Sequence, residues 1–297
     1  MKLTQKYFSV IILSGILLAF LWPTPGLLIK PYLIYLLGIM MTLSCLNIDL
    51  KELKSIKTEW WRYAMLMLMI FLIPPILTFF FHTFTLKDNA LYIGMMLAAA
   101  VPCGISIVFI TDILGGYSSK ALITTTLAHL VSPIITPLVF WFFVHKIITV
   151  DFSAMIILIL KLVIIPLVLA QIIKRFHWQE KISKVGGSIN TYLLLILLWG
   201  LVAPVKDLIL ENIKISLLTI GITILIMTIT AIIAKQFSKD NREDITWMVA
   251  STFKNFTLSS VIALSLFGQM ALLGSVIYGI VSNLIIVPLQ IIYKRKN

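Results

Sequence analysis

The sequence predicts an all-α membrane protein, and three observations support this fold class. Hydrophobic residues make up 60% of the 297-residue chain and charged residues only 12%, and the mean hydropathy is +1.05. Soluble domains are about 45–50% apolar and about 25% charged, so much of this surface must face lipid. The apolar residues fall into long runs without the alternation of a membrane barrel, and backbone groups in hydrocarbon then require helices.

Ten apolar runs are candidate spans, since a helix needs about 20 residues to cross a bilayer. They cover 8–22, 31–48, 62–81, 90–111, 121–144, 152–173, 188–204, 213–234, 245–267 and 271–293. Little chain is left for a soluble catalytic domain. The first run follows Lys2 and Lys6 as in a signal peptide, but Trp22-Pro23-Thr24-Pro25-Gly26 is no small-residue cleavage site, which favours a retained span.

The lysines and arginines predict the orientation of the chain. With the N-terminus inside, inner loops and ends carry 17 basic residues and outer loops carry 5. The positive-inside rule then predicts a multi-pass protein of the cell (inner) membrane with both termini cytoplasmic. Because the net charge of +12 belongs to these short loops, we expect the lipid bilayer, and no nucleic acid, as its partner. The two remaining basic residues, Lys161 and Lys254, lie inside predicted spans.

The two halves of the chain show a weak internal similarity. Ser132-Pro133-Ile134-Ile135-Thr136-Pro137-Leu138 is similar to Asn283-Leu284-Ile285-Ile286-Val287-Pro288-Leu289, and the offset of 151 residues also places Pro102 on Phe253. Five spans in each half would make the halves antiparallel in the membrane. The sequence therefore predicts two inverted five-helix repeats, 1–148 with spans 1–5 and 149–297 with spans 6–10, an arrangement typical of secondary transporters.

Polar breaks interrupt the fourth and ninth spans. Pro102 removes a backbone donor and Gly104 relaxes the helix, although a packing kink is the alternative. Lys254 lies in the second break, and a charge at the midplane costs about 2.5–3.5 kcal/mol, so we expect it to face a cavity. Half-helix N-termini favour anions. The candidate substrate-binding residues of the two breaks are Pro102, Cys103, Gly104, Ser106, Thr252, Lys254, Asn255 and Thr257.

The fifth and sixth spans add further candidates. Thr125, His129, Ser132 and Thr136 share one helical face, which predicts that Thr125 and His129 line the pathway. The alternative is that the hydroxyls bond to the preceding turn and His129 is a satisfied core histidine. Lys161 lies about 15 Å into the sixth span and is expected to face the cavity. Asp112 is interpreted as an interfacial carboxylate.

Several of these motifs together resemble the bile acid:sodium symporter family, within a superfamily that includes arsenite permeases and auxin carriers. They are Pro102-Cys103-Gly104, Gly116, Ser132-Pro133-Ile134-Ile135-Thr136-Pro137 and Lys254-Asn255. The resemblance implies ten transmembrane helices in which discontinuous helices 4 and 9 cross in a core domain, beside a panel domain built from spans 1, 2, 6 and 7. It implies secondary active transport of a small organic, anionic solute by alternating access.

The sodium-ligand positions that the resemblance implies are mostly replaced. They read Ile107, Val108, Ala121, Thr125, Ala250 and Lys254. Only Thr125 remains a possible sodium ligand, and the ammonium of Lys254 is expected to stand where a cation would bind. No cofactor is expected; a coupling ion, sodium or a proton, stays open, as does the oligomeric state.

Three alternatives belong to other classes. An arsenite permease is favoured by Pro102-Cys103 and Leu266-Phe267-Gly268, because a cysteine thiolate is a soft ligand that suits arsenic. A membrane-embedded enzyme is disfavoured, since the chain has no HExxH, no GxSxG and no paired intramembrane carboxylates. A channel would not need two broken helices in inverted positions. We therefore predict a transporter and no enzyme.

Overall fold

The computed structural model describes residues 8–46, 56–85, 88–176 and 178–294, and this part of the chain contains helices and no β-strand. Seven of its helical segments are long and apolar enough to cross a membrane, which confirms an all-helical, multi-pass membrane protein. The outermost ends of both predicted repeats lie outside the described residues. So do six basic residues of the predicted inner set, Lys2, Lys6, Lys51, Lys54, Arg295 and Lys296.

Prolines start or kink several helices in both halves. After α2 (Phe8–Leu21), Pro23 lies in the first turn of α3 (Pro23–Ile29), where its missing N–H leaves no bond unmade. The 3-10 turn η1 (Lys30–Tyr32) and α4 (Leu33–Cys45) continue this segment. It therefore begins before the apolar run that starts at residue 31. In the next segment, Pro74 and Pro75 follow the kink at Leu72 between α5 (Ile56–Phe71) and α6 (Ile73–Phe84).

The remaining long helices also match apolar runs of the sequence. α9 (Ser118–Val144), α12 (Gln179–Val202), α14 (Ile213–Lys235) and α17 (Gln269–Lys294) are single helices. The sixth run instead consists of α10 (Phe152–Ile159), the π-helical turn η3 (Leu160–Ile164) and α11 (Ile165–Arg175). The 3-10 turn η4 (Ala203–Val205) and α13 (Lys206–Glu211) join α12 to α14.

Two runs are divided into short helices at the polar breaks. α7 (Asn89–Ala100) and α8 (Ile107–Leu114) flank the break at Pro102, and α15 (Asn241–Thr252) and α16 (Phe256–Leu266) flank the break at Lys254. Side-chain caps start three of these helices: Asp88 accepts from the N–H of Leu91, Asp240 from Glu243 and Asn255 from Leu258. The short helices are thus regular elements with defined ends.

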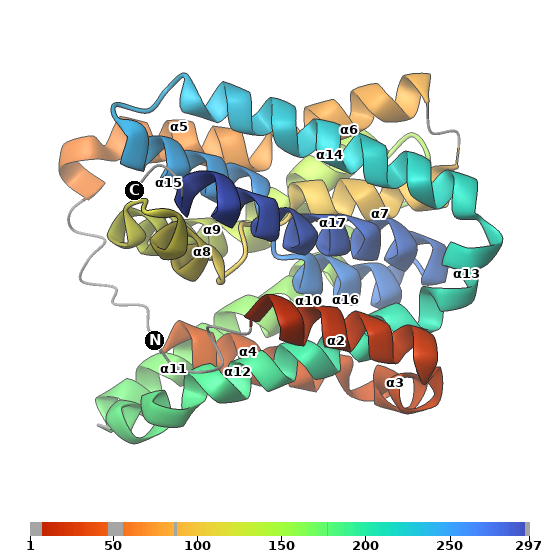
Figure 1. Ribbon diagram of the computed structural model, residues 1–297, viewed down its shortest axis with the longest axis horizontal. Helices are drawn as coiled ribbons and strands as arrows, with labels where there is room; N and C mark the ends of the chain where they lie inside the picture. Colours follow the sequence, from red (N-terminus) through yellow and green to blue (C-terminus); the bar gives the residue numbers. More distant parts are fainter. Residues whose placement is uncertain (1–7, 47–55, 86–87, 177, 295–297) are drawn as a thin grey trace.

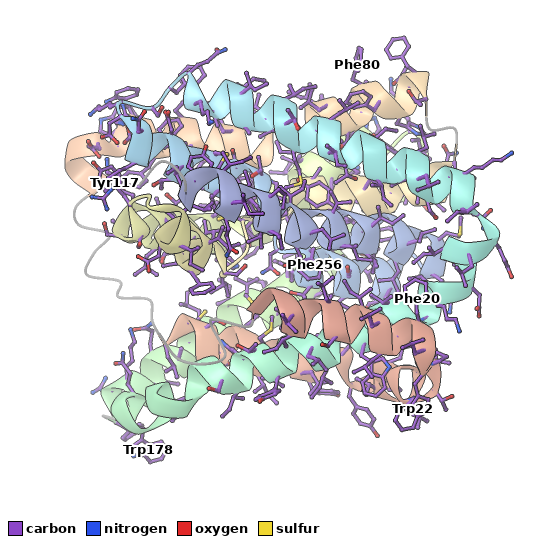
Figure 2. The ribbon with its side chains drawn as sticks, viewed as in Figure 1. Phe20, Trp22, Phe80, Tyr117, Trp178 and Phe256 are labelled. Carbon is purple, nitrogen blue, oxygen red and sulfur yellow. The ribbon has the colours of Figure 1, made fainter. Side chains whose placement is uncertain are left out.

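The helices form two layers (Figure 1). α2, α3, α4, α11 and α12 pack against one another in one layer, called the panel here, and α5 to α9 with α14 to α17 form the other, called the core. α7 and α17 lie side by side inside the core, and every α7 residue from Leu91 to Ala100 is buried. Large aromatic residues such as Trp22, Phe80 and Trp178 lie on the outside (Figure 2). Such a surface suits lipid contact.

The close contact between α7 and α17 at Gly94 predicts a specific packing defect. A Cβ atom on Gly94 of α7 would lie 1.8 Å from the carbonyl oxygen of Ala271 on α17. Gly94→Ala is therefore expected to force the helices apart, at about 1–3 kcal/mol, and to lower the thermal unfolding midpoint of the purified protein in detergent. Gly38→Ala on α4 is the matched control, because nothing lies within 4 Å of its Cβ position. Equal midpoints for the two variants would contradict this packing.

Candidate functional site

The two breaks lie against each other in the core. The N–H of Gly104 donates to the carbonyl of Phe253 at 2.9 Å, and the N–H of Asn255 donates to the carbonyl of Pro102 at 2.9 Å. These bonds form an isolated antiparallel bridge between Cys103 and Lys254. A break within hydrocarbon leaves backbone groups without helical partners. Here the two breaks supply partners for each other, so each one stabilises its counterpart.

A cavity of about 450 Å³ lies between this crossing and the panel. Met40, Met41 and Ser44 of α4 and Asn190, Thr191 and Leu194 of α12 line its panel side. On the core side the lining includes the first turns of α8 and α16, together with parts of α9 and α17. Helix N-termini carry partial positive charge. Both half-helices therefore present positive ends to the same space.

The structure divides ten of the eleven candidate residues, all except Lys161, into two groups. Six of them line the cavity: Gly104, Ser106, Thr125, Lys254, Asn255 and Thr257. Four others lie outside the lining, although they are buried in and around the crossing: Pro102, Cys103, His129 and Thr252. The hydroxyl of Thr252 donates to the carbonyl of Met248 at 2.7 Å, as expected for a hydroxyl that bonds to its own helix.

Lys161 does not face the cavity, which corrects the expectation from the sequence. Its side chain is exposed in the π-helical turn η3, while its neighbours Leu162 and Val163 are buried. The two apolar side chains occupy the inward positions of this turn, so the lysine is left on the outside. The position of Lys161 deep in a predicted span indicated that its ammonium needs a polar environment. That position does not specify the direction in which the side chain points.

Lys254 is buried in the crossing, with 3% of its surface exposed. Its ammonium donates to the carbonyl of Ile70, near the end of α5, and to the carbonyl of Val101, which caps the end of α7, at 3.2 Å. No carboxylate of the described chain pairs with it. Carbonyls at helix C-termini carry partial negative charge. The lysine therefore neutralises two helix ends in the way a bound cation would.

Asn255 connects the crossing to α9 and to the panel. Its Oδ1 accepts from the N–H of Leu258 at 3.2 Å and from the hydroxyl of Thr257 at 2.9 Å. Its Nδ2 lies 3.3 Å from Nε2 of His129 and 3.7 Å from Sδ of Met41 on α4. One amide thus caps α16, contacts a buried histidine and reaches across to the panel.

Thr125 extends this cluster along α9. Its carbonyl lies 2.8 Å from Nδ1 of His129, its hydroxyl donates to the carbonyl of Ala121 at 2.8 Å, and the Sγ atom of Cys103 lies 3.9 Å from the same hydroxyl. In the described part of the chain, no three His, Cys, Asp or Glu side chains gather as a metal site. The cluster is a hydrogen-bonded network of hydroxyl, thiol, amide and imidazole groups beside the cavity.

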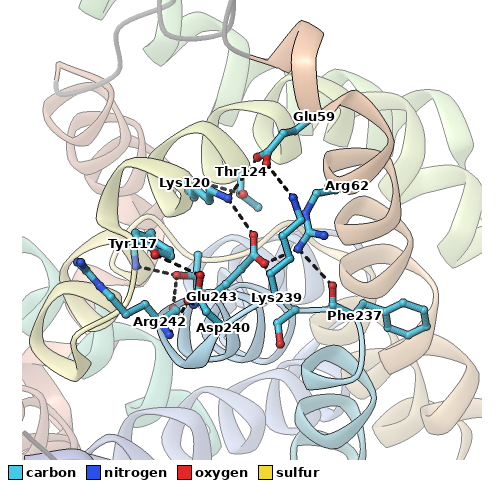
Figure 3. Close-up of polar contacts among 12 residues, drawn as sticks. Glu59, Arg62, Tyr117, Lys120, Thr124, Phe237, Lys239, Asp240, Arg242 and Glu243 are labelled. Atoms are coloured by element: carbon cyan, nitrogen blue, oxygen red, sulfur yellow. Dashed lines mark hydrogen bonds and ion pairs between the residues drawn. The ribbon is translucent and has the colours of Figure 1, made fainter.

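A second polar cluster lies at one end of the core, away from the crossing (Figure 3). Glu243 at the start of α15 is 1% exposed; it pairs with Arg62 of α5 and with Lys120 of α9, at 2.9 Å. Lys120 also pairs with Glu59 at 3.2 Å. A buried carboxylate requires such partners, because its desolvation is otherwise uncompensated. The cluster ties the same end of three core helices together.

The loop between α14 and α15 contributes to this ionic cluster. The N–H of Glu243 and the hydroxyl of Tyr117 donate to the Asp240 carboxylate, and these bonds hold the pKa of that carboxyl below its usual range. The guanidinium of Arg242 donates to the carbonyl of Gly115 at 3.2 Å. The loop before α9 and the loop before α15 are therefore held together at their polar ends.

None of the site residues predicted from the sequence lies on the panel side of the cavity. Ser44 and Asn190 form a 2.7 Å hydrogen bond across α4 and α12, and both line the cavity. Each lies near the end of a predicted span, where polar residues are ordinary. Asp112, interpreted as interfacial, also lines the cavity, where its carboxylate accepts from Ser118 at 2.9 Å. The small polar residues at these span ends were the feature of the sequence that could have indicated a polar cavity wall.

Comparisons with known proteins identify the family of this chain. The chain is similar to the uncharacterized sodium-dependent transporter YocS of Bacillus subtilis (strain 168), with 22% identity over 286 residues, covering 93% of this chain and 87% of the relative. Residues 6–295 match the family model described as the SBF-like CPA transporter family. The match covers nearly the whole chain and confirms the resemblance to bile acid:sodium symporters. This chain belongs to the SBF-like CPA transporter family.

Proposed function

We propose that this chain is a secondary transporter that moves a small organic anion across the cell membrane by alternating access. The observation that carries the proposal is the cavity between panel and core, onto which the N-termini of α8 and α16 both open. The positive ends of two helix dipoles suit a carboxylate or sulfonate. Among the described lining residues, Asp112 is the sole carboxylate.

The lining also supports an amphipathic solute. Met40, Leu122 and Leu194 offer apolar surface, while Ser44, Asn190, Thr191 and Thr257 offer hydroxyl and amide groups. A solute with an apolar body and one anionic group would satisfy both kinds of wall. The volume of about 450 Å³ falls in the range of pockets for small molecules.

Two inverted repeats, 1–148 and 149–297, remain part of the proposal, and the helix bounds support the offset of 151 residues. Shifted by that number, α7 falls on 240–251, where α15 is Asn241–Thr252, and α8 falls on 258–265, where α16 is Phe256–Leu266. Shifted likewise, α9 falls on 269–295, where α17 is Gln269–Lys294. We propose ten spans, with the two divided helices crossing at equivalent places in the two repeats.

The proposed orientation places both termini in the cytoplasm. Three residues of the predicted inner set, Arg62, Lys120 and Lys239, belong to the ionic cluster, which supports a common side for their loops. The starts of α5 and α15 lie at the same end of the molecule as the junction of α11 and α12, and opposite to α3 and α13 (Figure 1). This separation fits the positive-inside count.

We also propose that Lys254 takes the place of a coupling cation. The relative from Bacillus subtilis carries the name of a sodium-dependent transporter, yet five of the six sodium-ligand positions implied by the family resemblance lack a suitable group here. The ammonium of Lys254 already binds the helix-end carbonyls of Ile70 and Val101. Thr125 remains a candidate sodium ligand, because its hydroxyl proton points at the carbonyl of Ala121 and its oxygen lone pairs point elsewhere.

The orientation generates a labelling prediction. Arg175→Cys, at the end of α11, is expected to be inaccessible from outside intact cells, whereas Lys146→Cys, after α9, is expected to react with a membrane-impermeant thiol reagent. Both side chains are exposed, so access depends on the side of the membrane. Permeabilised cells should label both cysteines. Labelling of Arg175→Cys in intact cells would contradict the orientation.

Uptake into liposomes that contain the purified protein tests the transport function. A taurine-conjugated bile acid, supplied among several small organic anions, is expected to accumulate, and replacing sodium by potassium should change its initial rate by less than about two-fold, because Lys254 supplies a fixed cation. Asn190→Leu should fill the cavity and lower uptake about ten-fold, equivalent to about 1.4 kcal/mol.

Thr228→Leu is the matched control for uptake, since Thr228 lies on an exposed face of α14. No uptake of any supplied anion would refute the transport proposal. Uptake that stops when sodium is removed would instead refute the role given to Lys254 and would require sodium ligands other than the family positions.

Replacement of Cys103 separates organic-anion transport from the arsenite alternative. Cys103 is buried and outside the cavity lining, and the other cysteine, Cys45, lies in a separate apolar cluster with Leu46, Leu167 and Ala170. Cys103→Ser is therefore expected to leave anion uptake within about two-fold, as a near-isosteric change does. Loss of arsenite resistance in cells that carry Cys103→Ser would favour the alternative.

A further inference from the structure

The contacts of His129 determine where its protons lie. Nδ1 is 2.8 Å from the carbonyl oxygen of Thr125, and a carbonyl can only accept, so Nδ1 carries the hydrogen. Nε2 is 3.3 Å from Nδ2 of Asn255, and an amide nitrogen can only donate, so Nε2 is a bare acceptor. The orientation of the Asn255 amide is itself fixed, because its Oδ1 accepts from the backbone N–H of Leu258.

A proton on Nε2 would place two donors against each other. The Asn255 amide would have to turn so that Oδ1, and not Nδ2, faces the imidazolium. Turning removes Oδ1 from the N–H of Leu258 and the hydroxyl of Thr257, which uncaps α16. It also removes Nδ2 from Met41 on α4. One proton would therefore loosen both the first turn of α16 and a contact between core and panel.

The other titratable and charged groups around α9 are separate from the proton site on Nε2 of His129. At the two breaks, the thiol of Cys103 faces the hydroxyl of Thr125, and the ammonium of Lys254 binds the carbonyls of Ile70 and Val101. On the other elements packed against α9, Lys161 of η3 is exposed, and His82 of α6 stacks on Tyr92 of α7. The described charged groups of α8, α10 and α15 lie near helix ends: Asp112, Asp151, Arg242, Glu243 and Asp244. The described charged groups of α5, Glu59 and Arg62, pair with Lys120, Lys239 and Glu243 in the ionic cluster.

We propose that His129 is the proton-coupling residue of this transporter. The inference rests on the proposed function and deepens it by assigning the coupling ion as a proton. A proton from water in the cavity binds Nε2, the Asn255 amide turns, and α16 is released from its cap and from the panel. An anion in the cavity beside Asn255 stabilises the imidazolium, so binding of the anion and binding of the proton favour each other.

The accessibility of a cysteine in the cavity tests this switch without any substrate. Ser106→Cys places a thiol on the exposed, cavity-lining N-cap of α8, in a full-length protein whose buried cysteines are removed by Cys45→Ala and Cys103→Ser. Its reaction rate with a membrane-impermeant maleimide is measured in liposomes at about pH 8 and about pH 5.5, which bracket the ordinary titration of histidine.

The same ratio of rates is measured in His129→Gln. Comparing the two ratios cancels the intrinsic pH dependence of the reagent, because it is the same for both proteins. We expect the pH ratio of the parent protein to differ from that of His129→Gln by about three-fold or more, because the proton shifts the population of two cavity states. His145→Gln is the matched control at the C-cap of the same helix, with an exposed ring bound to backbone carbonyls, and should respond like the parent. Equal ratios in the parent and His129→Gln would overturn the proposal.

Asn255→Ser provides a second variant in case His129→Gln folds poorly. Serine can still cap α16 but offers His129 no amide, so the response to pH should disappear while the helix remains capped. A persistent response in Asn255→Ser would overturn the mechanism. Anion uptake by a protein without any response to pH would overturn the switch alone, whereas a clear response in a protein that moves none of the supplied anions would overturn the transport proposal alone.

Discussion

The pairing of backbone groups at the crossing is the constraint on which the rest of the structure depends. A divided helix within a membrane exposes peptide groups that water cannot reach, and each unpaired group costs several kcal/mol. The chain meets this requirement by placing its two breaks together, so that Gly104 bonds to Phe253 and Asn255 bonds to Pro102. The position of the crossing then fixes where α8 and α16 begin, and so where the cavity is lined by helix N-termini.

The positive charge at the crossing lies at helix C-termini, and the cavity lies at helix N-termini. The C-terminal carbonyls of α5 and α7 receive the ammonium of Lys254, while the N-termini of α8 and α16 open onto the cavity. A lysine without a carboxylate partner is thus stabilised by backbone dipoles and by the ring of Phe71, whose centroid lies 5.9 Å from its Nζ atom. The same geometry turns the positive ends of α8 and α16 toward the cavity, so the buried ammonium is compatible with the anion site that we propose there.

The contacts within the core differ in kind from the contacts between the core and the panel. Within the core, α5, α9 and α15 are joined by the buried pairs of Glu243 with Arg62 and Lys120. Across the crossing, the panel meets the core through the sulfur of Met41 and through Phe256, which packs with Leu198, Leu194 and Ile16. Ion pairs have strict geometry, whereas apolar contacts tolerate sliding. This difference suits a core that moves as a unit against the panel, as the alternating access that we propose would require.

The sequence by itself determined the class of fold, the helical segments, both breaks and the family. Apolar runs must be helices in lipid, and Pro102 and Lys254 mark places where a regular helix is costly. Tertiary structure alone decided which polar side chains share a space. Periodicity shows which residues of one helix lie on a common face, but not which helix that face meets; Lys161 therefore turned outward, while Ser44 and Asn190 came to line the cavity. The pair of Arg62 and Glu243, 181 residues apart, depends in the same way on the packing of distant helices, which no local pattern specifies.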